Sequence, residues 1–385
     1  MKNTSFIELS KSALTKNFKY LNKRIGKDAR LCSVIKGNAY GHGIENFLPL
    51  AEMCGVSYFA VADAIEAERA YNVKSPKSEL MIMSSIDKDE LEWAIENDIS
   101  FYVFEFDRIT NAVETAKKLK KKARIHIEFE TGFHRTGFEE EEFEELVNLV
   151  NENREHLHIE GLCTHYAGAE SISNFVRVNE QISRFNRYSK WFEKQGITAK
   201  YRHTACSAAT LIYPETHMDM VRVGIATYGY WPGNECRMYN LLSDDTHFRV
   251  DPLHRILTWK TRVMSLKKVP PGKFIGYGNT YMTTRNEQFA VIPVGYFHGF
   301  NRSLSNLGHV LIRNKKAPVV GLVNMNMTMV NVTNIKNVKI GDEAVMIGRQ
   351  GSQVITVASF ADSSKILNYE MLTRLPTEIP RYIVK

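Results

Sequence analysis

The sequence predicts an α/β protein in which an N-terminal (β/α)8 TIM-like barrel precedes a mostly β domain. Eight short apolar segments alternate with helical patterns such as 89–96 and 139–151. The candidate strands lie at 31–36, 58–63, 80–84, 101–106, 125–130, 159–165, 201–206 and 221–228. Eight strands separated by helices are typical of a closed parallel barrel, although a doubly wound open sheet would show the same alternation.

The pattern changes near residue 240, where helical periodicity fades. Strand-like segments follow at 255–263, 289–294, 309–312 and 318–323, separated by turns such as Pro270-Pro271-Gly272. Apolar segments interrupted by such turns indicate a β domain. We therefore expect a barrel over residues 1–243 and a β domain over residues 244–385, with residues 1–10 as candidates to pair with the second domain.

Composition indicates a globular cytoplasmic protein. A chain of 385 residues with 44% hydrophobic and 24% charged residues suits two domains. The N-terminus lacks the apolar core of a signal peptide, and no apolar run approaches the roughly 20 residues that span a bilayer. The five cysteines are scattered without a CxxC pair, which favours reduced thiols and argues against a zinc site. We expect no membrane partner and no metal.

The formal net charge of +7 raises the question of nucleic-acid binding. Five lysines cluster within 117–122, after a segment at 111–116 that looks like an amphipathic helix. Cations at a helix C-terminus complement the helix dipole, and no recognisable nucleic-acid module surrounds them. An anionic cofactor explains a mild basic excess equally well. We therefore expect no nucleic-acid partner.

Lys36 is the most informative residue. It ends the apolar segment 31–36 and precedes a turn rich in small residues. Burial at a strand end lowers a lysine's pKa, and such a lysine can form a Schiff base with an aldehyde. A lysine that extends its ammonium to solvent from a strand end is the plainer interpretation of this residue alone.

Four further polar residues follow or end predicted strands. They are Arg135, His165, Ser207 and Arg222. Each has an ordinary explanation by itself, such as a core histidine or the start of a helix. In a parallel barrel, however, the C-terminal ends of the strands meet at one rim, where catalytic groups gather. The sequence therefore predicts an active site at that rim.

The segment Lys36 to Gly43, Lys-x-x-Ala-Tyr-Gly-His-Gly, resembles the pyridoxal phosphate lysine motif of the alanine racemase family. The resemblance continues in order through 130–137, 161–168, 203–209, 219–229, 275–281, 292–296, 321–327 and 368–370. It implies a fold-type III enzyme with a (β/α)8 barrel, a C-terminal β domain and pyridoxal 5′-phosphate (PLP) as cofactor. It also implies a homodimer with shared active sites.

The resemblance implies a role for each matching residue. Lys36 would hold PLP and act as one acid/base, while Tyr277 of the second subunit would act from the opposite face of the cofactor. Arg222 would face the pyridine nitrogen and, as a permanent cation, keep PLP a weak electron sink. The remaining cofactor contacts would be Tyr40, His165, Ser207, Gly224, Ile225 and Tyr369. The amino-acid substrate would contact Arg135, Met325 and Tyr296.

Four positions depart from the family pattern. Glu128 stands where many members have a carbamylated lysine, and could supply a fixed negative charge that contacts Arg135. Asn326 replaces an aspartate, Phe297-His298 replaces Ala-Asp, and Leu322 replaces an entrance arginine. Arg302 is kept, and Glu170 resembles the acidic partner at the entrance. These changes affect the surroundings of the substrate, so alanine is the best single expectation while serine and larger amino acids stay open.

Three other functions remain alternatives at this point. A fold-type III amino-acid decarboxylase shares the barrel, the lysine and the β domain, but generally has an acidic partner at the pyridine nitrogen. A non-catalytic PLP-binding homeostasis protein resembles the barrel alone. A racemase scaffold without activity would not need to retain Lys36, His165, Arg222 and Tyr277.

Overall fold

A computed structural model describes residues 3–243, 251–359 and 368–385. The chain divides into two compact units. The first comprises residues 1–11, 38–47 and 256–385, and the second comprises residues 12–37 and 48–255. The predicted boundary after residue 243 adjoins segment 244–250, which lies outside the described residues. The units are called the β unit and the barrel unit below.

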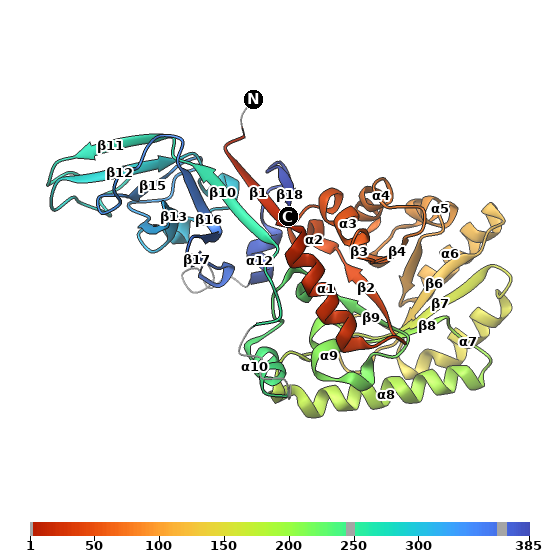
Figure 1. Ribbon diagram of the computed structural model, residues 1–385. Helices are drawn as coiled ribbons and strands as arrows, with labels where there is room; N and C mark the ends of the chain where they lie inside the picture. Colours follow the sequence, from red (N-terminus) through yellow and green to blue (C-terminus); the bar gives the residue numbers. More distant parts are fainter. Residues whose placement is uncertain (1–2, 244–250, 360–367) are drawn as a thin grey trace. The chain divides into compact units, whose positions relative to one another are not determined.

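The barrel unit contains one eight-stranded parallel sheet (Figure 1). Its strands neighbour one another in sequence order from β2 to β8, and β9 returns to pair with β2. Backbone bonds from Asp219 to Arg202 and from Arg222 to Ala205, N···O 3.2 and 2.9 Å, join β9 to the β8 side. The eight strands are β2 (Arg30–Val34), β3 (Tyr58–Asp63), β4 (Glu79–Ser85), β5 (Ser100–Val103), β6 (Ala123–Glu128), β7 (Leu157–Cys163), β8 (Tyr201–His203) and β9 (Met220–Val223).

This strand order confirms the predicted barrel and excludes the doubly wound alternative. An open doubly wound sheet reverses its strand order at a switch point, whereas these strands run consecutively until the last one meets the first. Most residues of the strands are buried, as all four residues of β5 and β9 are. Such continuous apolar runs are expected of parallel strands that are covered on both faces.

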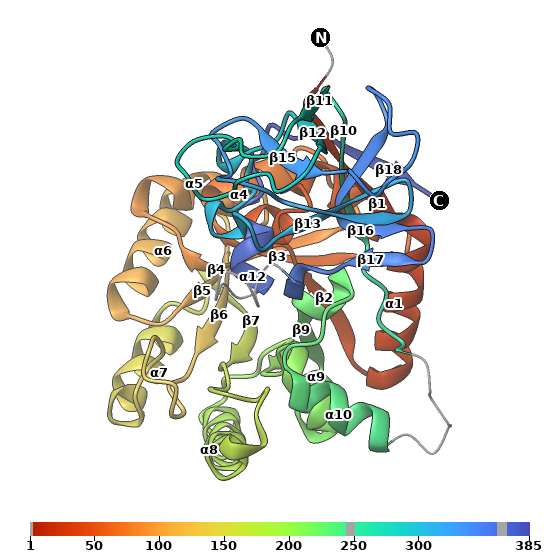
Figure 2. The same cartoon turned by 90° about the vertical axis from the view of Figure 1, so that its left-hand side faces the viewer.

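Helices surround the barrel strands, as Figure 2 shows for α1, α6, α7 and α8. Local capping explains several helix starts: the Asp63 carboxylate accepts from the Glu66 N–H at 2.8 Å, and the Glu66 carboxylate accepts from the Ala62 N–H at 3.1 Å. The helices that lie wholly or partly in this unit are α1 (Lys11–Ile25), α2 (Lys36–Tyr40), α3 (Ile44–Glu52), α4 (Ala64–Tyr71), α5 (Lys88–Glu96), α6 (Phe106–Leu119), α7 (Phe143–Glu152), α8 (Phe175–Lys194), α9 (Ser207–Ile212) and α10 (Asn234–Ser243). Four short 3-10 helices are η1 (Glu140–Glu142), η2 (Ile172–Asn174), η3 (Pro214–Thr216) and η4 (Ile225–Tyr228).

The β unit holds two sheets. In the larger one, β1 runs antiparallel to β10 and parallel to β18, so the start of the chain lies between strands from its second half. The smaller sheet has the order β11-β12-β15. The elements are β1 (Ser5–Ser10), β10 (Leu257–Arg262), β11 (Ser265–Val269), β12 (Glu287–Ile292), η5 (Tyr296–His298), η6 (Arg302–Leu304), β13 (His309–Ile312), β14 (Lys315–Pro318), β15 (Thr328–Asn331), β16 (Glu343–Gln350), β17 (Gln353–Ile355), α12 (Asn368–Thr373) and β18 (Arg381–Val384).

One expectation for the β unit is wrong. The strand expected at 318–323 lies instead at Lys315–Pro318, where β14 pairs with β13. The tight turn between them uses Arg313 and Asn314, both with positive φ, an arrangement typical of two-residue hairpins. Residues 319–323 are mostly buried, and their apolar side chains therefore resemble a strand in the sequence. Gly321, at φ +68°, ends any extended run there.

The lysines at 117–122 lie where α6 ends, at Leu119, and Lys120 takes a left-handed conformation with φ +53°. This is the solvated helix end that the sequence predicts. Among the helices of the described residues, none is both long and apolar enough to cross a membrane.

Candidate active site

Lys36 follows the first barrel strand rather than ending it. The predicted strand 31–36 stops at Val34, and Lys36 begins α2. Gly37, Asn38, Ala39 and Tyr40 all have φ between +49° and +62°, so the chain makes a left-handed turn immediately after the lysine. Non-glycine residues rarely adopt this conformation, and such strain concentrates at functional sites.

The environment of Lys36 shifts its protonation equilibrium toward the neutral amine. Solvent reaches the side chain, yet desolvation by the surrounding protein lowers its pKa, and the nearby charges of Arg135 and Arg222 lower it further. Glu66 opposes this effect without reversing it. A neutral amine is the nucleophile that reaction with an aldehyde requires. The structure therefore gives Lys36 the electrostatic property expected of a lysine that binds a carbonyl group.

Arg222 lies on β9 with only 4% of its surface exposed. One terminal nitrogen donates to the Nδ1 atom and the carbonyl oxygen of His203. The other donates to the carbonyl oxygens of Thr164 and Thr204, at 2.8 and 3.2 Å. Among the described residues, the Nε–H group is thus the one guanidinium donor without a protein acceptor. A ligand with an unprotonated nitrogen or an oxygen atom could accept from it.

Arg135 follows β6 on a loop that a carboxylate organises. Glu130 accepts from the backbone N–H groups of Gly132, Phe133 and His134. Gly137, at φ +123°, brings the returning chain against Glu130, since an added Cβ would lie 2.5 Å from the Glu130 nitrogen. The Arg135 guanidinium lies 4.2 Å from the centre of the Phe133 ring. The loop therefore presents a cation supported by an aromatic face.

The expected contact between Glu128 and Arg135 is absent from the described residues. Glu128 lies at the end of β6 with 4% exposure, and its Oε2 atom accepts from the Thr136 hydroxyl at 2.8 Å. Thr136 turns the carboxylate toward the neighbouring loop residue instead of the guanidinium. Burial raises the pKa of Glu128, although Thr136 and the charges of Arg222 and Arg135 oppose the shift. Whether Glu128 substitutes for a carbamate stays a prediction.

Ser207, Gly224 and Ile225 lie together beyond β8 and β9. The Ser207 hydroxyl accepts from the Gly224 N–H at 3.0 Å and from the Ala226 N–H at 3.5 Å. The expected phosphate donor at Gly224 is thus bonded to Ser207 in this structure. No hydrogen bond of the described backbone uses the Ile225 N–H. Hydroxyl and N–H groups gathered in this way are suited to bind phosphate oxygens.

His165 follows β7, two residues after Cys163. Its ring lies 5.6 Å from the Phe133 ring, centre to centre, on the loop that carries Arg135. Burial and the charges of Arg222, Arg135 and Lys36 lower the pKa of His165 to about 3. The imidazole is therefore neutral near pH 7 and available as a hydrogen-bonding group rather than as a cation.

Two tyrosines predicted to hold phosphate meet in the β unit. The rings of Tyr40 and Tyr369 lie 6.0 Å apart, centre to centre. Gly41 makes this possible, because a Cβ there would lie 1.8 Å from the Leu372 carbonyl oxygen of α12. The buried Arg381 side chain also donates to the Gly41 carbonyl at 2.9 Å. The turn after Lys36 is thus held against α12.

The other predicted residues of the β unit are exposed. Tyr277 is 72% exposed and lies between Gly276 and Gly278, both at φ +70°. Backbone bonds from Tyr296 to Asn324 and from Phe297 to Met325, both N···O 3.0 Å, hold two loops side by side. Met325 and Phe297 are 54% and 67% exposed. Arg302 lies 5.9 Å from the centre of the Tyr296 ring. Asn326 and Leu322 belong to the same loop as Met325.

The predicted residues therefore divide between the two units. Lys36, Glu128, Arg135, His165, Ser207, Arg222, Gly224 and Ile225 lie at the C-terminal ends of the barrel strands, whereas Tyr40, Tyr277, Tyr296, Met325 and Tyr369 belong to the β unit. Sequence reasoning did not assign a role to Glu130, Thr136 or His203. Glu130 could have been identified from sequence, because it directly precedes the turn at Thr131-Gly132, whose N–H groups it can accept from. Thr136 and His203 could not, because their contacts depend on the fold. The described residues contain no cluster of side chains that could hold a metal ion.

Comparison with known proteins agrees with this arrangement. The N-terminal domain of the alanine racemase family matches residues 9–232, and its C-terminal domain matches residues 256–383. An alanine racemase of Leptospira interrogans is 33% identical over 390 aligned positions, covering 100% of this chain and 97% of that protein. One of Carboxydothermus hydrogenoformans is 35% identical, covering 98% of each chain.

A solved structure extends the likeness to three dimensions. The alanine racemase of Bacillus anthracis with bound L-Ala-P superposes with a TM-score of 0.90 at 28% identity, covering 100% of this chain and 96% of that one. Both domains and nearly the full length of each relative are therefore matched. The chain belongs to the alanine racemase family.

Proposed function

We propose that this protein is a PLP-dependent isomerase that interconverts L- and D-alanine. The observation that carries the proposal is a set of three cations at the C-terminal rim of the barrel. Lys36, Arg135 and Arg222 form no ion pair among the described residues. They are close enough for the charges of the two arginines to lower the pKa of Lys36, and for all three charges to lower the pKa of His165. Cations without carboxylate partners suit a site for anions, here a phosphorylated cofactor and an amino-acid carboxylate.

The residues of the barrel unit fit PLP. Lys36 would carry the covalent link, and the Arg222 Nε–H would donate to the pyridine nitrogen. Ser207 and the Ile225 N–H would hold the phosphate, together with Tyr40 and Tyr369 of the β unit. When bound, PLP delocalises the negative charge that develops at the substrate α-carbon. Because Arg222 has negligible tendency to release a proton, it disfavours the decarboxylase alternative, in which an acidic partner faces that nitrogen.

Arg135 is suited to bind the substrate. A guanidinium fork matches a carboxylate with two parallel hydrogen bonds, and the Phe133 ring and the Glu130-capped loop hold this fork in place. Met325 and Tyr296 would form the substrate contacts of the β unit. A small amino acid is the substrate class, and alanine is the proposed member. Asn326 removes a charge near the carboxylate, so serine is the nearest competitor to be tested.

Two groups would move the α-proton. Lys36, whose pKa is lowered, would remove a proton from one face of the α-carbon. Tyr277 would serve the opposite face. It is 72% exposed on its own chain, and Phe297 and Met325 of the same unit are exposed as well. We propose that a second copy covers these residues, so that Tyr277 completes the partner's site in a homodimer.

The first test follows the α-proton. Purified protein with PLP is incubated with L-alanine in deuterated water, and D-alanine and α-deuteration are measured over time. Racemisation requires both products. Release of carbon dioxide with loss of the carboxylate would favour the decarboxylase, and absence of any α-exchange with a panel of amino acids would reject the enzymatic proposal. L-serine and larger amino acids in the same assay establish the preferred substrate.

The second test addresses the shared site. Lys36→Ala and Tyr277→Phe variants are each assayed alone and then mixed under conditions of subunit exchange. Activity should recover to about a quarter of the wild-type value, since half of the dimers are mixed and each mixed dimer has one intact site. No recovery, with exchange verified by differently tagged subunits, would show that each site is built within one chain.

A cytoplasmic location is part of the proposal. The five cysteines are all unpaired in the structure, and three of them are buried. Free thiols at this number suit a reducing compartment.

A further inference from the structure

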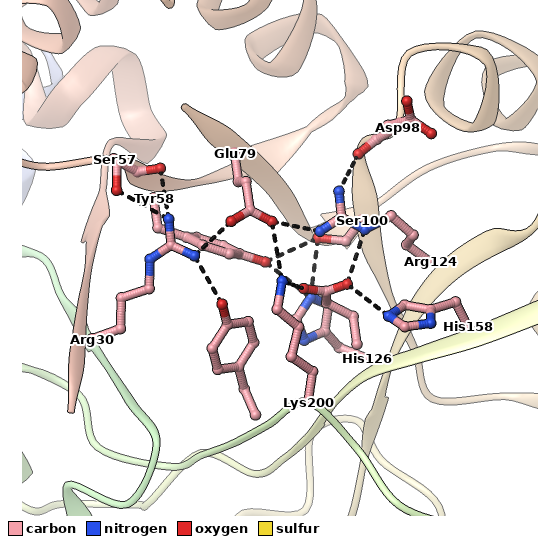
Figure 3. Close-up of polar contacts among 12 residues, drawn as sticks. Arg30, Ser57, Tyr58, Glu79, Asp98, Ser100, Arg124, His126, His158 and Lys200 are labelled. Carbon is pink, nitrogen blue, oxygen red and sulfur yellow. Dashed lines mark hydrogen bonds and ion pairs between the residues drawn. The ribbon is translucent and has the colours of Figure 1, made fainter. Parts of the chain in front are cut away.

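A line of buried polar groups runs inside the barrel away from Arg222. The Arg222 Nη1 atom lies 2.6 Å from Nδ1 of His203, and Nε2 of His203 lies 2.8 Å from Nδ1 of His126. Nε2 of His126 lies 3.0 Å from the Ser100 hydroxyl (Figure 3). His203, His126 and Ser100 have no exposed surface. These four residues are called the relay below.

The first donor fixes the direction of every bond in the relay. A guanidinium can only donate, so Nδ1 of His203 must accept and its proton must be on Nε2. That proton then points at Nδ1 of His126, which must also accept, so the second imidazole carries its proton on Nε2. The His126 N–H donates to Ser100, whose hydroxyl donates to the Leu80 carbonyl at 3.1 Å. Tyr58 supports this end, with its hydroxyl 3.2 Å from Ser100 Oγ and 3.4 Å from His126 Nε2.

Electrostatics agree with two neutral imidazoles. Burial lowers the pKa of His126 to about 3 and that of His203 well below its ordinary value. Arg222 lowers both further, and Arg124 lowers that of His126, against Glu160 and Glu79. A second proton on either ring would place N–H against N–H within the relay. Each imidazole is therefore held in one protonation state and one tautomer.

The backbone makes room for the central bond. A Cβ added at Gly161 of β7 would lie 2.2 Å from His126 Nδ1 and 2.6 Å from His203 Nε2. Any other residue at position 161 would therefore come between the two nitrogens. The Tyr102 ring packs against both imidazoles, with centres 5.8 and 6.0 Å away. The two histidines thus lie in a space shaped for their contact.

We propose that His126 and His203 are positioning residues for the racemase reaction, which hold Arg222 through a one-directional hydrogen-bond relay anchored at Ser100. The proposal rests on the proposed function. With His203 locked as an acceptor, both terminal nitrogens of Arg222 stay engaged, and its Nε–H would remain available to the pyridine nitrogen of bound PLP. Without the acceptor on His126, His203 can move its proton to Nδ1, where it would oppose the Arg222 N–H and displace the guanidinium.

Two substitutions at His126 separate hydrogen bonding from packing. His126→Phe keeps a ring of similar size but has no acceptor. His126→Asn leaves more empty space, but its side-chain oxygen can take the place of Nδ1 as an acceptor. If His126 acts through the relay, the asparagine variant should be the more active. If His126 only fills space, the phenylalanine variant should be the more active.

Steady-state kinetics provide the first readout. His126→Phe should lower kcat for alanine about tenfold, equivalent to about 1.4 kcal/mol, because Arg222 would be misplaced. KM should change less than about twofold, since Arg135 rather than Arg222 contacts the substrate. His126→Asn should recover most of the lost kcat. The Tyr102→Phe variant is the control, because it keeps the ring that packs on both imidazoles and removes a hydroxyl outside the relay. If His126→Phe is as active as Tyr102→Phe, the proposal is overturned.

Histidine nitrogen resonances provide a readout that does not depend on turnover. Protein labelled with ¹⁵N-histidine should show His203 with its proton on Nε2 in the wild type and in His126→Asn. In His126→Phe the proton should appear on Nδ1 of His203, or exchange between both nitrogens. A His203 tautomer that is the same in all three proteins contradicts the relay even if the activities differ. If the wild type does not racemise any amino acid, the proposed function fails, while this measurement still decides the hydrogen-bond relay itself.

A milder pair of substitutions applies if His126 variants do not fold. Ser100→Ala and Tyr58→Phe each remove one of two partners of the His126 N–H, so each alone should change kcat little. The double variant removes both partners and should lower kcat by more than the product of the single effects, because the two substitutions share one donor. Multiplicative effects of the two substitutions would show that the relay does not end at these hydroxyls.

Discussion

The two ends of the barrel use charged residues in opposite ways. Toward the N-terminal ends of the strands, Glu79 is paired with cations (Figure 3). Glu160 is paired with cations as well. The Glu79 carboxylate binds Arg30 and Arg124 at 2.5 and 2.6 Å, and Glu160 binds Arg124 and Lys200 at 2.9 and 3.1 Å. At the C-terminal ends, Lys36, Arg135 and Arg222 have no such partners among the described residues. Paired charges hold strands together, whereas unpaired charges are available to ligands.

Two buried glutamates on neighbouring strands show the same difference between paired and unpaired charges. Burial alone would raise the pKa of Glu160 on β7, but Arg124 and Lys200 outweigh burial and lower it to about 2. Glu128 on β6 has no ion pair among the described residues, and burial raises its pKa. The first glutamate is stabilised as an anion by its neighbours, while the second is destabilised as an anion. Partners rather than burial decide the sign of the shift.

The largest effect is expected at the end with unpaired charges. Lys36→Ala should reduce racemisation by at least about a thousandfold, because it removes both the covalent attachment and a proton-transfer group. The free energy of unfolding should not fall, since Lys36 forms no ion pair that would be lost. Racemisation assays and urea unfolding measure the two quantities separately. Borohydride reduction of the wild type should also fix the cofactor to the Lys36 peptide, and a label on another lysine would contradict the assignment.

Glu160→Gln, at the end with paired charges, should lower stability and leave racemisation unchanged. It leaves three cations, Arg30, Arg124 and Lys200, around the Glu79 carboxylate. We expect the free energy of unfolding to fall by about 3 kcal/mol, the lower part of the range for a broken buried pair. Lys200 is 44% exposed, which limits the loss. Racemisation at a temperature where the protein is folded should be unchanged. Glu92→Gln, in the exposed pair with Lys118 at 2.6 Å, is the control and should leave stability within error.

Acid titration provides a second test of Glu160. Because its pKa is lower when folded, its contribution to stability is present above the ordinary glutamate value of about 4.3 and is lost as pH falls toward about 2. The difference in stability between wild type and Glu160→Gln should therefore shrink in this pH interval. A constant difference from pH 7 to pH 2 would show that the carboxylate charge does not contribute to stability.

Sequence predicted the C-terminal end of the barrel, with Lys36 and Arg222, better than the N-terminal end, with Glu79 and Glu160. Lys36 and Arg222 were found because a motif surrounds each, and local motifs are visible in one dimension. The left-handed turn at Asn38, Ala39 and Tyr40 was not, because alanine and tyrosine give no local signal for positive φ, although asparagine adopts it more often. Glu79 and Glu160 lie 81 positions apart, and nothing near either one indicates that Arg124 joins them. The contact of His126 with His203 likewise depends on strand register and on the space left by Gly161.

The smallest effect is expected at Glu128, where the two glutamates can be compared directly. Because its pKa is raised in the folded protein, stability falls as pH rises from about 4.3 toward the raised value, and ionisation opposes folding above it. Glutamine imitates the protonated acid and can still accept from Thr136. Glu128→Gln should therefore not destabilise the protein at pH 8, unlike Glu160→Gln, and urea unfolding at pH 5 and pH 8 measures the difference.

Activity of Glu128→Gln tests whether this residue replaces a carbamate. Since Glu128 contacts Thr136 instead of Arg135, its charge can act on the guanidinium only from a distance, and we expect KM for alanine to rise by a few fold, about 0.5–1 kcal/mol, with a smaller change in kcat. Wild-type activity should not depend on bicarbonate. Thr136→Val, which removes the hydroxyl but no charge, is the matched control. If Thr136→Val raises KM as much as Glu128→Gln does, the carboxylate orders the loop through Thr136, and its charge is not a substitute for a carbamate.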